Sequence, residues 1–193
     1  ALKERMGKYN FSDQTFFQFE TRDGTQLNGY MVKPPDFDES REYPVLMRCY
    51  GGPGIQTVKN EWGYYDYTYN QLLAQKGYIV VSVDNRGTGA RGREFQKMTY
   101  QNLGHYETID QIAGANYLAE QPYVDSSRIG IFGWSYGGYL SLLSLAKGSE
   151  AFQTGVAVAP VTDWRFYDNI YTERYMRRPS VNEEGYEQSS VLN

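Results

Sequence analysis

The chain has 193 residues, a length that suits one domain with a sizeable hydrophobic core. Its hydrophobic fraction of 40% and charged fraction of 22% are ordinary for a globular domain, and no apolar run approaches the ~20 residues of a membrane-spanning helix. The net charge of −4 argues against nucleic acid as the main partner, and a single cysteine, Cys49, excludes an internal disulfide.

Strand-like segments alternate with helical ones along most of the chain. In chain order, apolar and β-branched runs predict strands at Phe16–Glu20, Leu27–Lys33, Tyr43–Arg48, Tyr78–Val83, Arg128–Gly133 and Phe152–Ala159. Helical periodicity predicts helices at Asn70–Lys76, Glu107–Glu120 and Tyr136–Lys147, and residues 161–193 are expected to be irregular. The alternation favours an α/β fold with a mostly parallel sheet and helices on both faces.

A Gly-x-Ser-x-Gly pattern at Gly133–Gly137 joins one of these strands to a helix. Glycines on either side of the serine relieve the crowding of a sharp turn, which holds the serine in a strained conformation and lifts its hydroxyl above the sheet. The start of the following helix favours negative charge that develops beside Ser135. The pattern predicts a nucleophile at Ser135. The alternative is a glycine-rich turn that only packs helix on strand, and Gly138, one more small residue, argues against it.

A serine nucleophile also needs two hydrogen-bond donors for the oxyanion that forms on its substrate. The backbone N–H of Tyr136, directly after Ser135, is the first candidate because of the geometry of this turn. The second is expected from the loop Tyr50–Gly54, where glycines let the backbone approach a ligand and the Tyr50 hydroxyl can donate directly. The alternative interpretation of this loop is turn chemistry alone.

Tyrosine is frequent in the chain, with 19 residues, many of them between Tyr167 and Tyr186. Amphipathic rings at that density indicate an aromatic-lined cleft or a large contact surface. Taken alone, Trp164, Tyr167 and Tyr171 would be interpreted as core or interface aromatics.

Four motifs occur together in the order found in a known family. They are Tyr50–Pro53, Asp84–Gly89, Gly133–Tyr139 and Tyr171–Met176. Together they resemble the catalytic domain of the prolyl oligopeptidase family, nearest to its dipeptidyl peptidase IV branch, over nearly the whole chain. The resemblance implies an α/β-hydrolase fold and a serine peptidase, with Ser135 as the nucleophile and the Tyr136 amide and Tyr50 hydroxyl as oxyanion donors.

The resemblance also implies a specificity for proline. The residues that match the family's proline pocket are Val161, Trp164, Tyr167, Tyr171 and, through its ring, Tyr136. A flat aromatic box suits a pyrrolidine ring, which has apolar faces and no N–H to satisfy. The parent protein is therefore expected to be an exopeptidase that releases dipeptides or tripeptides after proline, through an acyl-enzyme intermediate.

Partners and location rest on the same resemblance. It implies peptide substrates with proline second from the N-terminus, a homodimer of the intact protein, and a protein that is secreted, periplasmic or membrane-anchored. No cofactor is expected, and no His-x-x-x-His or Cys-x-x-Cys spacing points to a metal.

The catalytic triad is the point at which the chain departs from the family. In this fold an acid and then a histidine follow the serine along the chain, yet no histidine follows Ser135. His105, the single histidine, is expected to be a surface or cap residue, and Asp163 to be a loop carboxylate. Residues 1–193 are expected to be the N-terminal part of the hydrolase domain. The propeller domain and the C-terminal segment with the triad Asp and His are expected outside the chain, which should be inactive alone.

Two other functions stay open. The same scaffold serves acylaminoacyl peptidases, oligopeptidases and small-ester hydrolases, against which the aromatic set at Trp164, Tyr167 and Tyr171 favours proline. A non-catalytic binding or assembly module is the third interpretation, and the retained Ser135 argues against it.

Two buried features are predicted near the site. Arg86, in a glycine-rich loop, is expected to pair with Asp110, a charged position on a mainly apolar helix. Cys49, in an apolar run, is expected to be a small buried hydrophobe.

Overall fold

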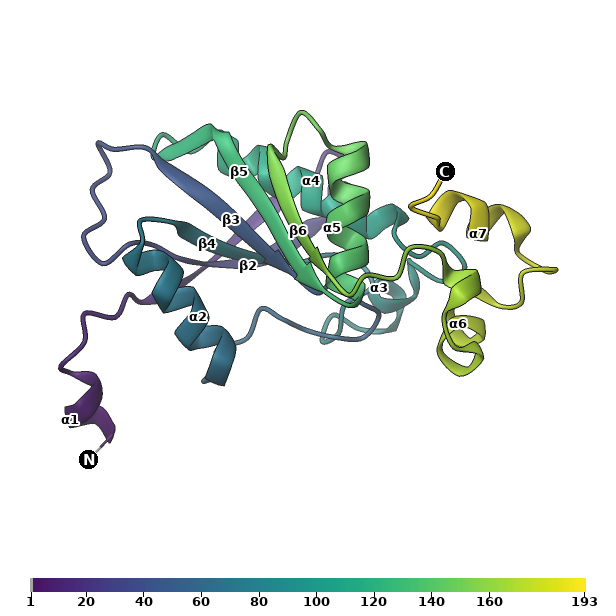
Figure 1. Ribbon diagram of the computed structural model, residues 1–193, viewed down its shortest axis with the longest axis horizontal. Coiled ribbons are helices and arrows are strands. Elements are labelled where there is room, and N and C mark those ends of the chain that lie inside the picture. The colour runs from purple at the N-terminus through teal and green to yellow at the C-terminus, as the bar shows by residue number, and fades with distance from the viewer. Residues whose placement is uncertain (1) are drawn as a thin grey trace.

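A six-stranded sheet lies at the centre of the computed structural model, which describes residues 2–193 (Figure 1). Its strands are β1 (Gln14–Glu20), β2 (Gln26–Val32), β3 (Tyr43–Cys49), β4 (Ile79–Asp84), β5 (Val124–Trp134) and β6 (Thr154–Val158). Their order across the sheet is β1-β2-β4-β3-β5-β6, with β2 antiparallel to both neighbours and the other pairs parallel. The predicted α/β class with a mostly parallel sheet is confirmed.

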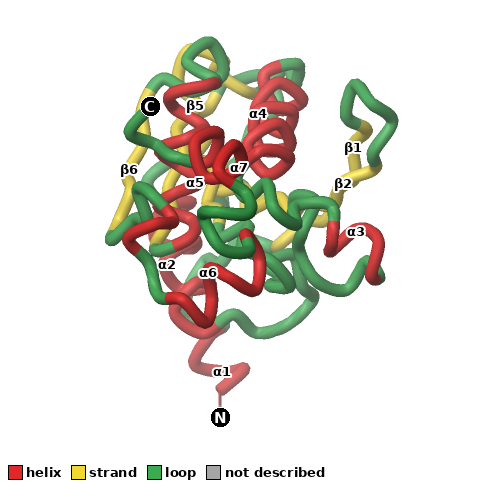
Figure 2. Tube along the Cα trace, turned by 90° about the vertical axis from the view of Figure 1, so that its right-hand side faces the viewer, coloured by secondary structure: helices red, strands yellow, loops and turns green. Residues whose placement is uncertain are grey.

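Helices cover both faces of this sheet and continue beyond the carboxyl ends of its parallel strands (Figures 1 and 2). In chain order they are α1 (Leu2–Met6), α2 (Tyr64–Gln75), α3 (Arg93–Lys97), α4 (His105–Ala119), α5 (Tyr136–Lys147), the 3₁₀ turn η1 (Trp164–Phe166), α6 (Asn169–Met176) and α7 (Glu183–Ser189). Helices α4 and α5 pack on one face and α2 on the other, while α6 and α7 extend past the strand ends. No helix within residues 2–193 is long and apolar enough to cross a membrane.

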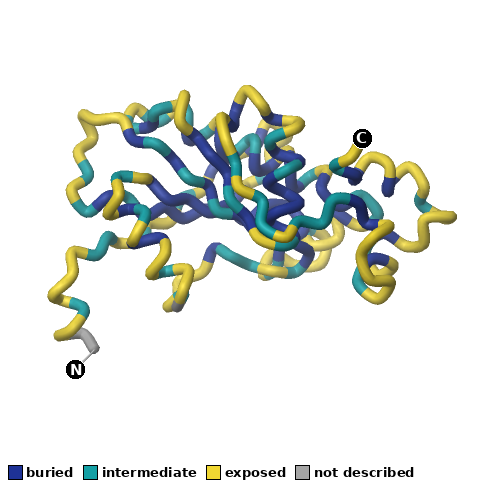
Figure 3. Tube along the Cα trace, viewed as in Figure 1, coloured by how far each residue is buried: buried dark blue, intermediate teal, exposed yellow. Residues whose placement is uncertain are grey.

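Strand β4 shows why the sheet is covered on both sides. All six of its residues are buried, and successive side chains of a strand point to opposite faces. Val81 belongs to the main core, together with Leu118 of α4 and Leu140 of α5. Val80 packs on the other face against Ala74 of α2. In Figure 3 the buried residues are concentrated in these central strands.

The short helices α1 and α3 were not predicted, and the predictions were wrong at two further places in the helices. Helix α2 begins at Tyr64, six residues before the predicted start, because its tyrosines and threonine have only moderate helix propensity and hide the periodicity. The stretch expected to be irregular contains η1, α6 and α7. These elements are too short to be stable alone, and packing stabilises them: Met176 of α6 and Tyr186 of α7 are both fully buried.

Met176 and Tyr186 belong to a second hydrophobic cluster, which we call the aromatic cluster. Its buried members are Leu103, Tyr136, Tyr139, Leu143, Trp164, Met176 and Tyr186, and its partly buried members are Tyr50, Val161, Tyr171, Tyr175 and Val191. The cluster joins α5 to the segment after β6, next to the carboxyl ends of the strands. It brings Tyr50, at the start of the loop after β3, together with residues of the C-terminal helices.

Candidate active site

Ser135 lies between β5 and α5 in a conformation that non-glycine residues rarely adopt. Its backbone angles are φ 58° and ψ −115°, which are strained for a side chain with a Cβ atom. Hydrogen bonds on both sides hold it there: Ser135 N donates to Val158 O of β6 at 2.9 Å, and Tyr139 N donates to Ser135 O at 3.0 Å. The residue is partly exposed, so the turn presents the serine at the surface of the sheet end.

The glycines of this turn are required by the close approach of three elements. A Cβ atom on Gly133 would overlap the carbonyl of Gly137. One on Gly137 would overlap the carbonyl of Cys49, at the end of β3. The sequence prediction of a sharp strand-to-helix turn therefore agrees with the geometry, and the turn also packs directly against the loop that follows β3.

That loop is supported by the glycine-rich segment Asp84–Gly89, a role that the sequence did not reveal. Asn85 Nδ2 donates to Gly51 O at 3.0 Å, and Gln111 Nε2 of α4 donates to Asn85 Oδ1 at 3.0 Å. Gly54 N donates to Gly87 O at 2.8 Å. The two bonds of Asn85 are buried, and the three bonds together fix the backbone of residues 51–54.

Tyr50 stands at the start of this loop, beside Tyr136. The two ring centroids are 6.1 Å apart. Burial, with smaller contributions from Tyr167 and Tyr175, raises the pKa of the Tyr50 hydroxyl. The group therefore stays protonated at neutral pH and remains a hydrogen-bond donor, as an oxyanion site requires.

The five residues predicted to form the pocket lie together. Trp164 stacks on Tyr171 with centroids 5.8 Å apart and an interplanar angle of 19°. Tyr167 stands perpendicular to both, and the Tyr136 ring lies 5.5 Å from Trp164. Val161 packs on the same cluster. Tyr136 and Trp164 are buried at its base, whereas Tyr167 is 42% exposed and is accessible to a ligand.

Glu107, the third residue of α4, is a fully buried acid beneath this cluster, and sequence reasoning missed it. Tyr136 Oη donates to Glu107 Oε1 at 2.7 Å, and Gly104 N donates to Glu107 Oε2 at 3.0 Å. Burial raises the pKa of its carboxyl from 4.5 to about 7, although both hydrogen bonds act in the opposite direction. Its only signal in the sequence is a Glu in the first turn of a helix, which predicts a cap.

This pKa predicts a pH dependence of stability. The unfolded chain releases the proton near pH 4.5 and the folded chain only near 7, so the folded state binds more protons in this interval. The free energy of unfolding is therefore highest below the pKa that Glu107 has in the unfolded chain. It falls by about 3 kcal/mol as pH rises through the pKa that Glu107 has in the folded chain. This can be measured by urea unfolding of the parent protein at about pH 4 and at about pH 8. Between these two pH values the free energy of unfolding of Glu107→Gln should rise relative to that of wild type by this amount, because the glutamine does not titrate. A difference that does not change with pH would contradict it.

The predicted buried ion pair is present and has a third member. Arg86 Nη2 donates to Asp110 Oδ1 at 2.6 Å, and Arg86 Nη1 donates to Asp23 Oδ2, from the β1–β2 hairpin, at 2.6 Å. Burial alone would lower the pKa of Arg86, but the hydrogen bonds and charges of both carboxylates raise it. The network fixes α4 and the hairpin to the loop after β4.

His105 and Asp163 take the positions that the sequence predicted for them. His105 is exposed at the first residue of α4, with its ring 4.9 Å from that of Tyr106. Asp163 is buried, caps η1 by accepting from Arg165 N at 2.8 Å, and pairs with the Arg165 guanidinium at 2.9 Å. Cys49 is buried as predicted, and burial raises the pKa of its thiol to about 12, so it is not a nucleophile.

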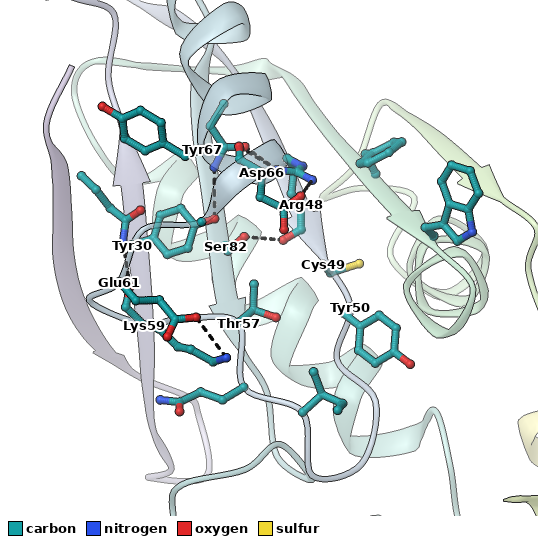
Figure 4. Close-up of a pocket in the computed structure, with 17 residues that line it drawn as sticks. Tyr30, Arg48, Cys49, Tyr50, Thr57, Lys59, Glu61, Asp66, Tyr67 and Ser82 are labelled. Carbon is teal, nitrogen blue, oxygen red and sulfur yellow. Dashed lines mark hydrogen bonds and ion pairs between the residues drawn. The ribbon is translucent and has the colours of Figure 1, made fainter. Parts of the chain in front are cut away.

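A cavity of about 340 Å³, lined by charged, polar and aromatic side chains, opens on the other side of Tyr50. Figure 4 shows its lining, which includes Tyr30, Arg48, Lys59, Glu61, Asp66 and Ser82, with Tyr50 at one side. Its charges are balanced, because Arg48 pairs with Asp66 at 2.7 Å and Lys59 with Glu61 at 3.3 Å. Trp134, which precedes Ser135, also lines it and is 63% exposed.

Within the part of the chain that the structure describes, no group of three or more His, Cys, Asp or Glu side chains is arranged to hold a metal ion. The described residues bring together a strained serine, Tyr136 directly after it, and the aromatic cluster, which also contains Tyr50.

Comparison with known proteins agrees with this geometry. The model of the prolyl oligopeptidase family matches residues 64–193. A protein named "Probable dipeptidyl-aminopeptidase B" from Arthroderma gypseum is 54% identical over 174 residues, which are 90% of this chain and 19% of that protein. A protein of the same name from Paracoccidioides brasiliensis is 47% identical over all 193 residues, which are 21% of its length.

The fold has a matching solved structure. The crystal structure of Porphyromonas gingivalis dipeptidyl peptidase 4 superimposes with a TM-score of 0.95 and 52% identity, covering 100% of this chain and 27% of that one. The mostly parallel sheet is thus that of an α/β-hydrolase catalytic domain. The chain spans about a fifth of the length of the curated relatives it matches.

Proposed function

The chain belongs to the prolyl oligopeptidase family, and on that basis we propose that its parent protein is a serine exopeptidase that releases dipeptides after proline. The observation that carries the proposal is the strained conformation of Ser135 next to the aromatic cluster. Backbone strain of this kind persists where the surrounding structure enforces it, and it is concentrated at functional sites. Release of tripeptides after proline, which the resemblance also allows, stays a prediction.

In the proposed reaction, Ser135 Oγ attacks the carbonyl carbon of the proline residue. A bond forms between Oγ and this carbon, and the negative charge moves onto the carbonyl oxygen, where the Tyr136 amide and the Tyr50 hydroxyl donate hydrogen bonds. A general base takes the serine proton and passes it to the leaving amine as the peptide bond breaks. Water then hydrolyses the acyl-enzyme and regenerates the serine.

The general base is proposed to come from outside this chain. His105 is its only histidine and is exposed at the start of α4, and Asp163 is already bonded to Arg165. The triad acid and histidine are accordingly expected in a further segment of the same domain. The chain alone is expected to show no turnover.

The aromatic cluster is proposed to hold the proline of the substrate. Tyr167 and Tyr171 present ring faces above the buried Trp164, and Val161 adds an aliphatic wall. A pyrrolidine ring packs on such faces without leaving a donor unpaired. The leaving peptide is then placed across Tyr50, toward the cavity that Trp134 also lines. The homodimer and the secreted, periplasmic or membrane-anchored location stay predictions of the resemblance.

The proline pocket can be tested in the parent protein with dipeptide chromogenic substrates. Tyr171→Ala should lower kcat/KM for a Gly-Pro substrate by about 10- to 100-fold, and for a Gly-Ala substrate by much less, because lost contact with the pyrrolidine ring is worth about 1–3 kcal/mol. Tyr65→Ala is the matched control, since Tyr65 is 90% exposed on α2. Equal losses of kcat/KM on both substrates would contradict the assignment of these residues to a proline pocket. If the wild-type protein instead prefers acylated amino acids or simple esters, the alternative hydrolases are favoured.

A further inference from the structure

The buried acid Glu107 makes more contacts than a helix cap requires. Capping α4 needs one acceptor for the Gly104 amide, and Glu107 Oε2 supplies it at 3.0 Å. The other oxygen, Oε1, accepts the Tyr136 hydroxyl at 2.7 Å, across 29 residues of sequence. Both side chains are buried, with exposed fractions of 0% for Glu107 and 2% for Tyr136. The carboxylate thus connects the start of α4 to the residue directly after Ser135.

Tyr136 is held on several sides of its ring, and its hydroxyl is the remaining point of attachment. The ring centroid lies 6.1 Å from Tyr50, 5.4 Å from Tyr139 and 5.5 Å from Trp164. Rings in such tilted and edge-on contacts can still slide against one another, whereas a short hydrogen bond to a carboxylate fixes the distal end of the side chain. Because Tyr136 begins α5, motion of its side chain is transmitted to the backbone N–H beside Ser135.

Burial of a carboxylate at this position disfavours its ionised form. A residue that served only as a helix cap would not need to be ionisable. A glutamine would satisfy the Gly104 amide without a buried charge. Asp110 on the same helix opposes ionisation of Glu107, and the other titratable groups facing it are the hydroxyls of Tyr136, Tyr139 and Tyr171. The cation of Arg86 is paired with Asp110 and is not available to Glu107. A buried acid in such surroundings, one hydrogen bond away from the residue that follows Ser135, favours a functional role.

We propose that Glu107 is a positioning residue for catalysis: by accepting the Tyr136 hydroxyl and the Gly104 amide, it fixes the tyrosine whose N–H stabilises the oxyanion and whose ring forms the base of the proline pocket. The inference rests on the proposed function of Ser135 and Tyr136. Glu107 touches no reacting atom, and its effect is exerted through Tyr136.

The test compares Glu107→Gln, Tyr136→Phe and the double variant in the intact parent peptidase. Tyr136→Phe removes the hydroxyl, and Glu107→Gln replaces the charged acceptor of that hydroxyl with a neutral amide group, which gives a weaker hydrogen bond. Both variants leave the ring and an acceptor for the cap. Each should lower kcat on a Gly-Pro substrate by about tenfold while KM changes less than about threefold, because small misplacement of a catalytic donor reduces the rate more than binding. The double variant should lose no more than the worse single variant, since both remove one interaction.

Two results would overturn the proposal: unchanged kcat in both single variants despite a lower Tm, or losses that multiply in the double variant. Leu118→Ala is the matched control, because Leu118 is buried in the same helix but in the main core. It should lower Tm and leave kcat unchanged, and a tenfold kcat loss in this variant as well would also overturn the proposal.

The rate at which a fluorophosphonate probe labels Ser135 distinguishes a failure of the positioning role from a failure of the proposed proline specificity. If wild type reacts with the probe but does not cleave Gly-Pro, the proline specificity fails, and slower labelling of Glu107→Gln still supports the positioning role. Equal labelling of wild type and Glu107→Gln would overturn the positioning role alone. A wild-type protein that neither reacts with the probe nor cleaves Gly-Pro would overturn both.

Discussion

Replacing Ser135 by alanine in the parent peptidase should abolish turnover of a Gly-Pro substrate, with a fall in kcat of about 10⁴-fold or more. The reason is that Ser135 supplies the atom that bonds to the substrate. Removing the nucleophile from a working triad lowers kcat by a factor of this order. Substrate affinity should be nearly unchanged, because the aromatic cluster that is proposed to bind proline does not include the serine. Steady-state kinetics and covalent labelling with a fluorophosphonate probe measure the two effects.

Ser149→Ala is the control for this substitution, since Ser149 is an exposed serine well separated along the chain. It should label and turn over like wild type. Retained turnover or retained labelling of Ser135→Ala would show that the nucleophile lies elsewhere. The proposal for the whole site would then fail.

Removing the hydroxyl of Tyr50 should produce the second largest effect. Tyr50→Phe is expected to lower kcat by about 10²- to 10³-fold with little change in KM, because a donor to the oxyanion acts in the transition state and hardly at all in the ground state. The ring, and its contact with Tyr136 at 6.1 Å, is preserved in phenylalanine. The loss therefore reports on the hydroxyl and not on packing.

Tyr65→Phe is the matched control because the Tyr65 side chain is almost fully exposed on α2. Its kinetics should equal those of wild type. If Tyr50→Phe keeps kcat within about threefold of wild type, the second donor must instead be the backbone N–H of Gly51 or Gly52, because Pro53 has none and Gly54 N already donates to Gly87 O.

The central elements and the serine turn were predictable because they depend on short-range patterns. The predicted helix Tyr136–Lys147 has the same bounds in the structure, and the buried run near Val80 forms the fully buried strand β4. Hydrophobic residues recur every 2 residues in a strand and every 3.6 residues in a helix, and a short stretch of sequence is enough to detect either period. The glycines around Ser135 are just as local, since they are needed where a strand turns directly into a helix.

The helices after β6 depended on packing. In α6 and α7, the Asp168 side chain accepts from Tyr171 N at 2.9 Å, and Met176 and Tyr186 are buried against elements far away in the sequence. Segments of seven or eight residues have too few hydrogen bonds to offset their own conformational entropy. Their sequence therefore carries only a weak helical signal.

The fold class and the place of Ser135 in a strand-to-helix turn followed from local sequence patterns, and the aromatic residues were assigned to one group through the family resemblance. Only the tertiary structure decided which polar groups support them: Asn85 holds Gly51, Glu107 holds Tyr136, and Asp23 joins Arg86 across 63 residues. No local period encodes such a partner, because each of these bonds joins side chains or loops that meet only after helices and strands have packed. Buried polar groups must find such partners, and the packed fold determines which ones they find.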